Sequence, residues 1–381
     1  MKEITQIINQ YKEAAAKGLR TALATVVHLE GSSYRRPGAR MLVTEEGSIT
    51  GAISGGCLEG DALKKAQLVI ARNTPQLVTY DTSREEDASI GFQLGCAGVI
   101  RVLFEPLSPE GPAIPVQLLE ATLASRSNHT LVTFFSDQPE NSGTCMLFNE
   151  DGNFSGTAPW PELTTHLATA AQQAFSEQRS YFHRIELSGR AIHAFIQFVP
   201  PQISLVIAGA GNDAIPLSII AEELGWHVQV IDGRHTHARP ERFSASCQVF
   251  TGKPENLLEH VSIDKRTAVV MMTHNYQYDL AMLKLLLNAA SPYLGMLGPR
   301  KKLERMIDEL RSAGMTITSE MMQKVYGPVG LNLGAETPEE IALSIAAEIQ
   351  SVFAGKHGDS LRNGPAVIHD REQLKIRQQQ S

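Results

Sequence analysis

The sequence has little of what marks several large classes of protein. Its 381 residues include four cysteines, and aromatic residues make up 6% of the chain. The 34 Lys and Arg residues are outnumbered by 41 Asp and Glu residues, which gives a formal net charge of -7. A dedicated nucleic-acid-binding protein would show a basic excess instead. No stretch approaches the roughly 20 apolar residues of a membrane span. We therefore expect neither nucleic acid nor a membrane among the partners.

The N-terminus lacks the apolar core of a signal peptide. Residues 1–17 show the spacing of an amphipathic helix and include acidic side chains. Because no export signal is seen, we expect a cytoplasmic location. In that reducing compartment the cysteines stay as free thiols. The cysteines match no zinc-finger spacing and stand at Cys57, Cys96, Cys145 and Cys247.

The order of the predicted elements indicates two domains and a tail. Residues 1–200 mix helices and strands, and the strands between 108 and 200 are expected to continue the sheet of the first 107 residues. Pro200 and Pro201 cannot continue a central strand and mark the boundary. Strands then alternate with helices over residues 201–356, followed by a polar tail over 357–381. The expected fold class is α/β, an N-terminal mixed α/β domain plus a C-terminal Rossmann-like doubly wound parallel sheet.

A glycine-rich turn opens the C-terminal domain. Gly209, Gly211 and Ala214 fit the G-x-G-x-x-G/A pattern between a predicted strand and a predicted helix. Asp232 ends the next predicted strand, where an acidic side chain binds a ribose hydroxyl in dinucleotide-binding proteins. The pattern predicts an NAD(P) or other nucleotide site. A Rossmann-like fold that has lost nucleotide binding is the alternative.

Two further candidates follow later strands of the same sheet. His274 comes directly after a predicted strand, and Arg300 opens a predicted helix. Open α/β sheets bind ligands outside the carboxyl ends of their strands, so both residues are candidate cofactor contacts. Arg300 would hold a phosphate through two hydrogen bonds. A helix-capping or solvated role for His274 is the alternative.

Three arginines and two cysteine-bearing glycine turns are candidate site residues of the N-terminal domain. Glycines allow a close backbone approach, and a helix N-terminus attracts anions and favours a thiolate. Thiols beside arginines suit a soft metal or sulfur atom next to an anionic group. Two tight turns with incidental buried cysteines are the alternative. The residues concerned are Arg35, Arg36, Arg40, Gly55, Gly56, Cys57, Gly95 and Cys96.

The chain resembles the XdhC/CoxI family, accessory proteins of molybdenum hydroxylases such as xanthine dehydrogenase. At the N-terminal end the resemblance rests on "GSSYRRPGARM", "GAISGGCLEGD" and "LGCAGVIRVLFEP". At the C-terminal end it rests on "VIAGAGNDAIPL", "MMTHNYQYDLAML" and "YLGMLGPRKKLERM". Ala97 and Asn212 depart from the glycine and the histidine that are common in the family at those positions.

The resemblance implies an accessory chaperone rather than a catalyst. Such a protein binds the molybdenum cofactor, a pterin with a dithiolene and a terminal phosphate. It helps a cysteine desulfurase to sulfurate the cofactor and passes it to an apo molybdenum hydroxylase. Cys57 and Cys96 would face the molybdenum or carry sulfur, with Cys96 the candidate metal ligand, and the arginines would clamp the phosphate. A homodimer is expected, because closed symmetric dimers are the commonest oligomers.

Two other functions are open on the sequence alone. An NAD(P)-dependent oxidoreductase would use the glycine-rich turn, with His274 as proton donor. A non-catalytic scaffold that recruits the sulfur donor and the hydroxylase would need neither Cys57 nor Cys96.

Overall fold

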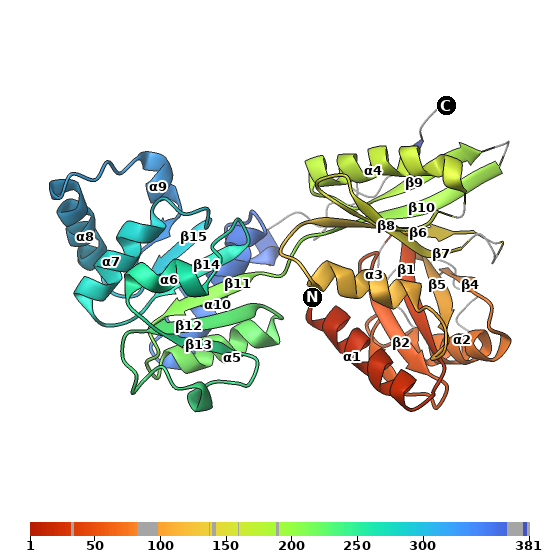
Figure 1. Ribbon diagram of the computed structural model, residues 1–381, viewed down its shortest axis with the longest axis horizontal. Coiled ribbons are helices and arrows are strands. Elements are labelled where there is room, and N and C mark those ends of the chain that lie inside the picture. Colours follow the sequence, from red (N-terminus) through yellow and green to blue (C-terminus); the bar gives the residue numbers. More distant parts are fainter. Residues whose placement is uncertain are drawn as a thin grey trace. The chain divides into compact units, whose positions relative to one another are not determined.

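The computed structural model describes residues 1–31, 34–81, 98–136, 138, 142–158, 160–187, 190–363 and 376–378. The chain divides into two compact units, and each is described by itself (Figure 1). The first unit spans Glu3–Pro201, and the second begins at Gln202. Residues 376–378 pair with a strand of the first unit, so the polar tail contributes a short strand there.

The first unit contains an antiparallel five-stranded sheet, called sheet A. Its strand order is β3-β2-β1-β5-β4, and β1 pairs with both β2 and β5. On one face, alternate side chains of the strands pack against helix α2 (Glu59–Arg72). The strands are β1 (Thr21–Gly31), β2 (Arg40–Thr44), β3 (Ile49–Gly51), β4 (Gln76–Asp81) and β5 (Gly98–Leu107).

The strands between 108 and 200 form a sheet of their own, so the expectation that they continue sheet A is wrong. This second sheet, sheet B, has the order β17-β9-β10-β6-β7-β8. Strand periodicity predicts which face a side chain occupies but not which distant strand is the partner. The strands are β6 (His129–Phe135), β7 (Gly143–Asn149), β8 (Phe154–Gly156), β9 (Tyr181–Leu187), β10 (Arg190–Val199) and β17 (Ile376–Gln378).

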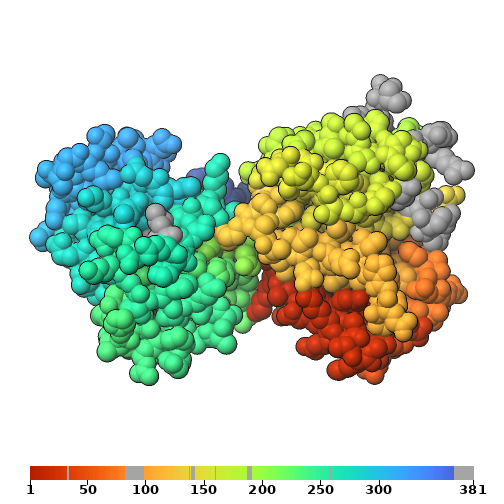
Figure 2. Space-filling model, in the orientation of Figure 1, coloured from red at the N-terminus to blue at the C-terminus, as the bar shows by residue number. Residues whose placement is uncertain are grey.

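Sheets A and B pack face to face inside the first unit. Val27 and Leu103 of sheet A share a buried cluster with Phe135, Phe182 and Phe195 of sheet B. Helix α4 (Thr164–Glu177) covers the outer face of sheet B. Helices α1 (Lys2–Ala16) and α3 (Ile114–Leu123) pack against a further cluster that both sheets share. Figure 2 shows the residues of the two sheets, red to orange and yellow to yellow-green, in one continuous body.

The second unit confirms the predicted doubly wound parallel sheet. Sheet C has the order β13-β12-β11-β14-β15-β16, and each neighbouring pair is parallel. The strand order reverses between β11 and β14, which is where such sheets bind ligands. The strands are β11 (Ser204–Ala208), β12 (His227–Asp232), β13 (Gln248–Thr251), β14 (Thr267–Met271), β15 (Tyr293–Met296) and β16 (Val325–Tyr326).

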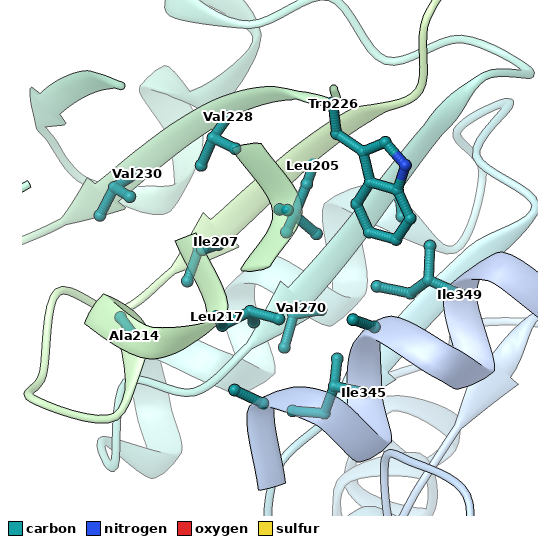
Figure 3. Close-up of a cluster of buried hydrophobic side chains, with 14 of the residues drawn as sticks. Leu205, Ile207, Ala214, Leu217, Trp226, Val228, Val230, Val270, Ile345 and Ile349 are labelled. Atoms are coloured by element: carbon teal, nitrogen blue, oxygen red, sulfur yellow. The ribbon is translucent and has the colours of Figure 1, made fainter. Parts of the chain in front are cut away.

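Helices cover both faces of sheet C. Helices α5 (Ala214–Glu223) and α10 (Pro338–Phe353) pack on one face, and Figure 3 shows Ile345 and Ile349 against β11 and β14. On the other face α7 (Tyr276–Leu286) and α8 (Arg300–Ser312) bury a second cluster. The short helices α6 (Leu257–His260) and α9 (Ser319–Gln323) complete the unit. Among the residues described, no helix is both long and apolar enough to span a bilayer.

Candidate functional site

The turn before α2 carries Cys57 and is held by its own side chains. The Ser54 N–H donates to Glu59 Oε1 at 2.8 Å, and the Ser54 hydroxyl donates to the other carboxylate oxygen. The same hydroxyl accepts hydrogen bonds from the N–H groups of Gly56 and Leu58, at 3.2 and 3.0 Å. Burial acts to raise the pKa of Glu59, but hydrogen bonds, those from Ser54 foremost, together outweigh it and lower that pKa. The turn is therefore preorganised without a ligand.

The same turn leaves open space beside Gly56. Gly56 has a φ of +110°, and a Cβ added there would meet no heavy atom of the described residues within 4 Å. Cys57 follows it, partly exposed and partly packed against the core between α2 and sheet A.

The arginine-rich loop, residues 34–40, lies against this turn. An added Cβ at Gly55 would be 3.4 Å from the ring of Tyr34, so the ring covers that glycine. The Arg35 Nε–H donates to the carbonyl oxygen of Ala52 at 3.2 Å, and the Arg35 guanidinium forms an ion pair with Glu3 of α1. The arginine-rich loop and the turn before α2, which are separate in the sequence, are therefore in contact.

The three arginines of the loop have different surroundings. Arg36 is exposed, whereas Arg40 is 1% exposed and lies between sheets A and B. The Arg40 guanidinium donates to Gly38 O at 2.9 Å and to Gln197 Oε1 at 2.7 Å. Burial lowers the pKa of Arg40 to about 10, against the opposing effect of Glu105. Arg40 is thus protonated at neutral pH and holds the loop in place, while Arg36 is exposed.

Of the other cysteines, the two that the structure describes are more deeply buried than Cys57. Cys96, with Gly95, lies outside the described residues. Cys247 is buried in the core of the second unit, and burial raises the pKa of its thiol to about 12. Burial also raises the pKa of the Cys145 thiol. Within the described part of the chain, no group of three or more His, Cys, Asp and Glu side chains is arranged to hold a metal ion.

The second candidate site is the carboxyl edge of sheet C. The N–H of Gly209 donates to Ile231 O at 2.7 Å, and the N–H of Met272 donates to Ala208 O at 2.8 Å. The ends of β11, β12 and β14 are thereby joined. Gly209 has a φ of +127°, and a Cβ there would be 2.5 Å from the backbone oxygen of Met272. No other residue fits that position, which explains the first glycine of the pattern.

At this edge the Asp232 carboxylate accepts hydrogen bonds from Ala210 and Arg234. Its Oδ2 accepts from the Ala210 N–H at 2.8 Å and from Arg234 Nη2 at 2.7 Å. Its Oδ1 accepts from the backbone N–H and the Nε–H of Arg234, at 2.8 and 2.9 Å. The side chain is 3% exposed. Burial acts to raise the pKa of Asp232, but these hydrogen bonds outweigh it and lower the pKa.

His274 pairs with an acid inside the glycine-rich turn. Its Nε2 lies 2.9 Å from Oδ2 of Asp213, the residue just before α5. The His274 side chain is 67% exposed, and its backbone adopts the left-handed region at a φ of +55°. A carboxylate that orients one ring nitrogen leaves the other available, as in acid–base pairs.

A buried network supports the segment that carries His274. The Thr273 hydroxyl donates to Asp279 Oδ1 at 2.6 Å, and Lys302 Nζ donates to Asp279 Oδ2 at 2.6 Å and to Leu297 O at 3.1 Å. Asp279 is fully buried. The network joins the segments that follow β14 and β15. Arg300, exposed at the first position of α8, lies on the second of these segments.

Sequence patterns did not identify Asp213, Ser54 or Glu59. Asp213 and His274 are 61 residues apart, so spacing gives no sign of their pairing. The available signal was the aspartate itself, because it lies inside a glycine pattern that usually binds phosphate. For the turn at Cys57, the signal was a serine followed by a glutamate at the start of a predicted helix.

The two units define a protein that joins a two-sheet α/β unit to a Rossmann-type unit. Residues 14–81 match the XdhC and CoxI family, and residues 205–349 match the XdhC Rossmann domain. A Bacillus subtilis protein, named as a probable component of xanthine dehydrogenase, is 31% identical over 327 residues, covering 86% of this chain and 91% of that protein. The chain therefore belongs to the XdhC and CoxI family.

Two further relatives extend over most of the chain. The molybdenum cofactor insertion chaperone PaoD of Escherichia coli is 24% identical, covering 91% of this chain and 88% of that protein. A crystal structure from Bacillus halodurans, described as a xanthine dehydrogenase, matches with a TM-score of 0.71 and 28% identity. It covers 92% of this chain and 97% of the other.

Proposed function

We propose that this protein is a chaperone that binds the molybdenum cofactor, assists its sulfuration, and inserts it into a xanthine dehydrogenase-like hydroxylase. The observation that carries the proposal is the meeting of the Cys57 turn with the arginine-rich loop. Membership of the XdhC and CoxI family and the similarity to an insertion chaperone support it.

The residues at the Cys57 turn fit the chemistry of this cofactor. A thiol is a suitable neighbour for a soft metal or a sulfur atom, and an exposed guanidinium suits a phosphate. Cys57 and Arg36 supply these two groups on adjoining segments. The open face of Gly56 allows a ligand to approach the backbone. When bound, the cofactor supplies the molybdenum centre that the hydroxylase uses.

The protein's own residues have separable roles in this proposal. Ser54 and Glu59 hold the turn, so little conformational entropy is lost when a ligand binds. Arg40 fixes the arginine-rich loop from beneath. Cys57 and Arg36 then contact the ligand, and Cys96 is the second thiol proposed from the sequence.

The test is retention of the cofactor by the purified protein in the absence of air. Cofactor released from a molybdenum enzyme is mixed with the protein and passed through a gel-filtration column, and the pterin that co-elutes is measured by its fluorescence after oxidation. Cys57→Ser should lower retention by about tenfold or more, because a hydroxyl is a poor ligand for a soft metal. Cys96→Ser should have a similar effect.

Cys145→Ser is the matched control, because its thiol lies in the same unit but is largely buried in sheet B. It should retain the cofactor like the unmodified protein. If the unmodified protein retains no cofactor, the chaperone function is wrong. If Cys57→Ser retains the cofactor and activates the hydroxylase normally, the function stands and the assignment of Cys57 is wrong.

A further inference from the structure

The glycine-rich turn of the second unit lacks the opening that a dinucleotide needs. In dinucleotide-binding sites the second glycine leaves its side-chain position empty so that the pyrophosphate can approach the backbone. Gly211 is that glycine, and the space is filled by Asp213. An added Cβ at Gly211 would overlap with Asp213 Oδ1. The site therefore presents a carboxylate where two phosphate charges would have to lie.

Asp213 is held in this position from the far side of the turn. Its other oxygen, Oδ2, pairs with His274 Nε2 at 2.9 Å. His274 belongs to the segment that the buried Asp279 anchors through Thr273. The Asp213 side chain is 19% exposed, so water screens its charge only in part. Moving Asp213 aside would break this pair.

The ribose position is also occupied. The Asp232 carboxylate already accepts hydrogen bonds from the backbone of Ala210 and from the backbone and side chain of Arg234. A ribose hydroxyl would have to displace one of these donors at a side chain that is 3% exposed. Two features that bind a dinucleotide elsewhere are thus satisfied within this chain.

We propose that Asp213 is a specificity-determining residue that keeps diphosphate ligands, NAD(P) included, out of the Rossmann-type unit. A ligand at this edge must present a neutral or cationic hydrogen-bond donor to Asp213, such as a hydroxyl, an amine or a heterocyclic N–H. The inference goes beyond the proposed chaperone function, because it concerns the second unit and does not depend on cofactor binding near Cys57.

The experiment measures binding of ADP and NADH to the full-length protein by isothermal titration calorimetry. The unmodified protein should bind neither ligand with a dissociation constant below about 1 mM, because the Asp213 carboxylate repels the phosphate charges. Asp213→Ala, which removes both the charge and the bulk, should bind ADP at least about tenfold more tightly. Asp213→Asn, which removes only the charge, should fall between the two.

Adding Arg234→Ala to Asp213→Ala should tighten ADP binding further, because Asp232 is then free for the ribose hydroxyls. Asp308→Ala is the control, since Asp308 is exposed on α8 and only weakly paired with Arg311. It should bind ADP no better than the unmodified protein. Circular dichroism and thermal unfolding establish that each variant is folded.

Micromolar binding of ADP or NADH by the unmodified protein would overturn the proposal. So would a folded Asp213→Ala variant that binds ADP no more tightly than the unmodified protein. Neither result would bear on cofactor retention by the Cys57 turn, because these titrations contain no molybdenum cofactor.

Discussion

The glycine-containing turns before α2 and α5 both lead into a helix, but they differ in the side chains that surround their glycines. The turn before α2 is braced by Ser54 and Glu59 from within, and the space beside Gly56 stays open. The turn before α5 is closed by Asp213, which fills the space at Gly211. Both sequences look like sites for an anionic ligand. Glycines leave space beside the backbone, and the neighbouring side chains decide whether a ligand can occupy it.

The largest effect should come from one substitution, glycine to alanine, made in both turns. Gly209→Ala should destabilise the second unit by about 4 kcal/mol, because its methyl group would meet the backbone of Met272 and its φ of +127° is strained. Gly56→Ala should cost the first unit about 1–2 kcal/mol, because only the strain at φ +110° applies.

Urea unfolding measures both free energies when each unit has its own tryptophan fluorescence signal. Trp226 lies in the core of the second unit and Trp160 packs against sheet B, and the chain has two tryptophans. Each is therefore followed in a background where the other is replaced by Phe. Equal costs at Gly56 and Gly209 would show that the backbone is no more crowded at Gly209 than at Gly56.

The next largest effect should come from the support behind the closed turn. Asp279→Ala leaves Lys302 without its buried counter-charge, so we expect the second unit to lose about 3 kcal/mol in free energy of unfolding. The same urea titration with Trp226 fluorescence measures it. Asp308→Ala, on the exposed face of α8, should change the value by less than about 0.5 kcal/mol. A cost for Asp279→Ala as small as that of Asp308→Ala would mean that the network does not anchor His274.

The smallest effect concerns pH. Hydrogen bonds hold the pKa of Asp232 below its unfolded value of 3.8. Its contribution to stability is therefore complete above about pH 4 and is lost as the pH falls further, through the folded pKa. Arg234→Ala removes the two hydrogen bonds from the guanidinium and should make the fall in stability below about pH 4 shallower, measured as thermal midpoints. The backbone donor at position 234 remains unless the turn rearranges, so part of the slope should persist. Arg311→Ala, whose partner Asp308 is 3.9 Å away and exposed, should leave the slope unchanged.

Local patterns predicted most of the fold because they depend on neighbouring residues. The alternation of strands and helices gave the doubly wound sheet C, and the G-x-G-x-x-A spacing located the turn between β11 and α5. The division of the first unit into sheets A and B was not predictable in this way. It depends on pairings such as that of His129 with Val199, which are distant in the sequence.

The candidate sites show the same limit. Asp232 and His274 were located at strand ends from the sequence alone, as the parallel sheet requires. Their hydrogen-bonding partners were not, because Arg234 competes with any ligand for Asp232, and Asp213 reaches His274 across the turn. Side-chain direction decided what each residue contacts.

The buried guanidinium of Arg40 has a mechanical consequence. It ties the arginine-rich loop, through Gly38, to Gln197 on the opposite sheet. A swing of that loop over a ligand would take the Gly38 carbonyl oxygen away from a buried cation, which costs about 1.5–3 kcal/mol. We therefore expect this loop to act as a fixed wall rather than a lid, so that whatever enters must fit a shape already set.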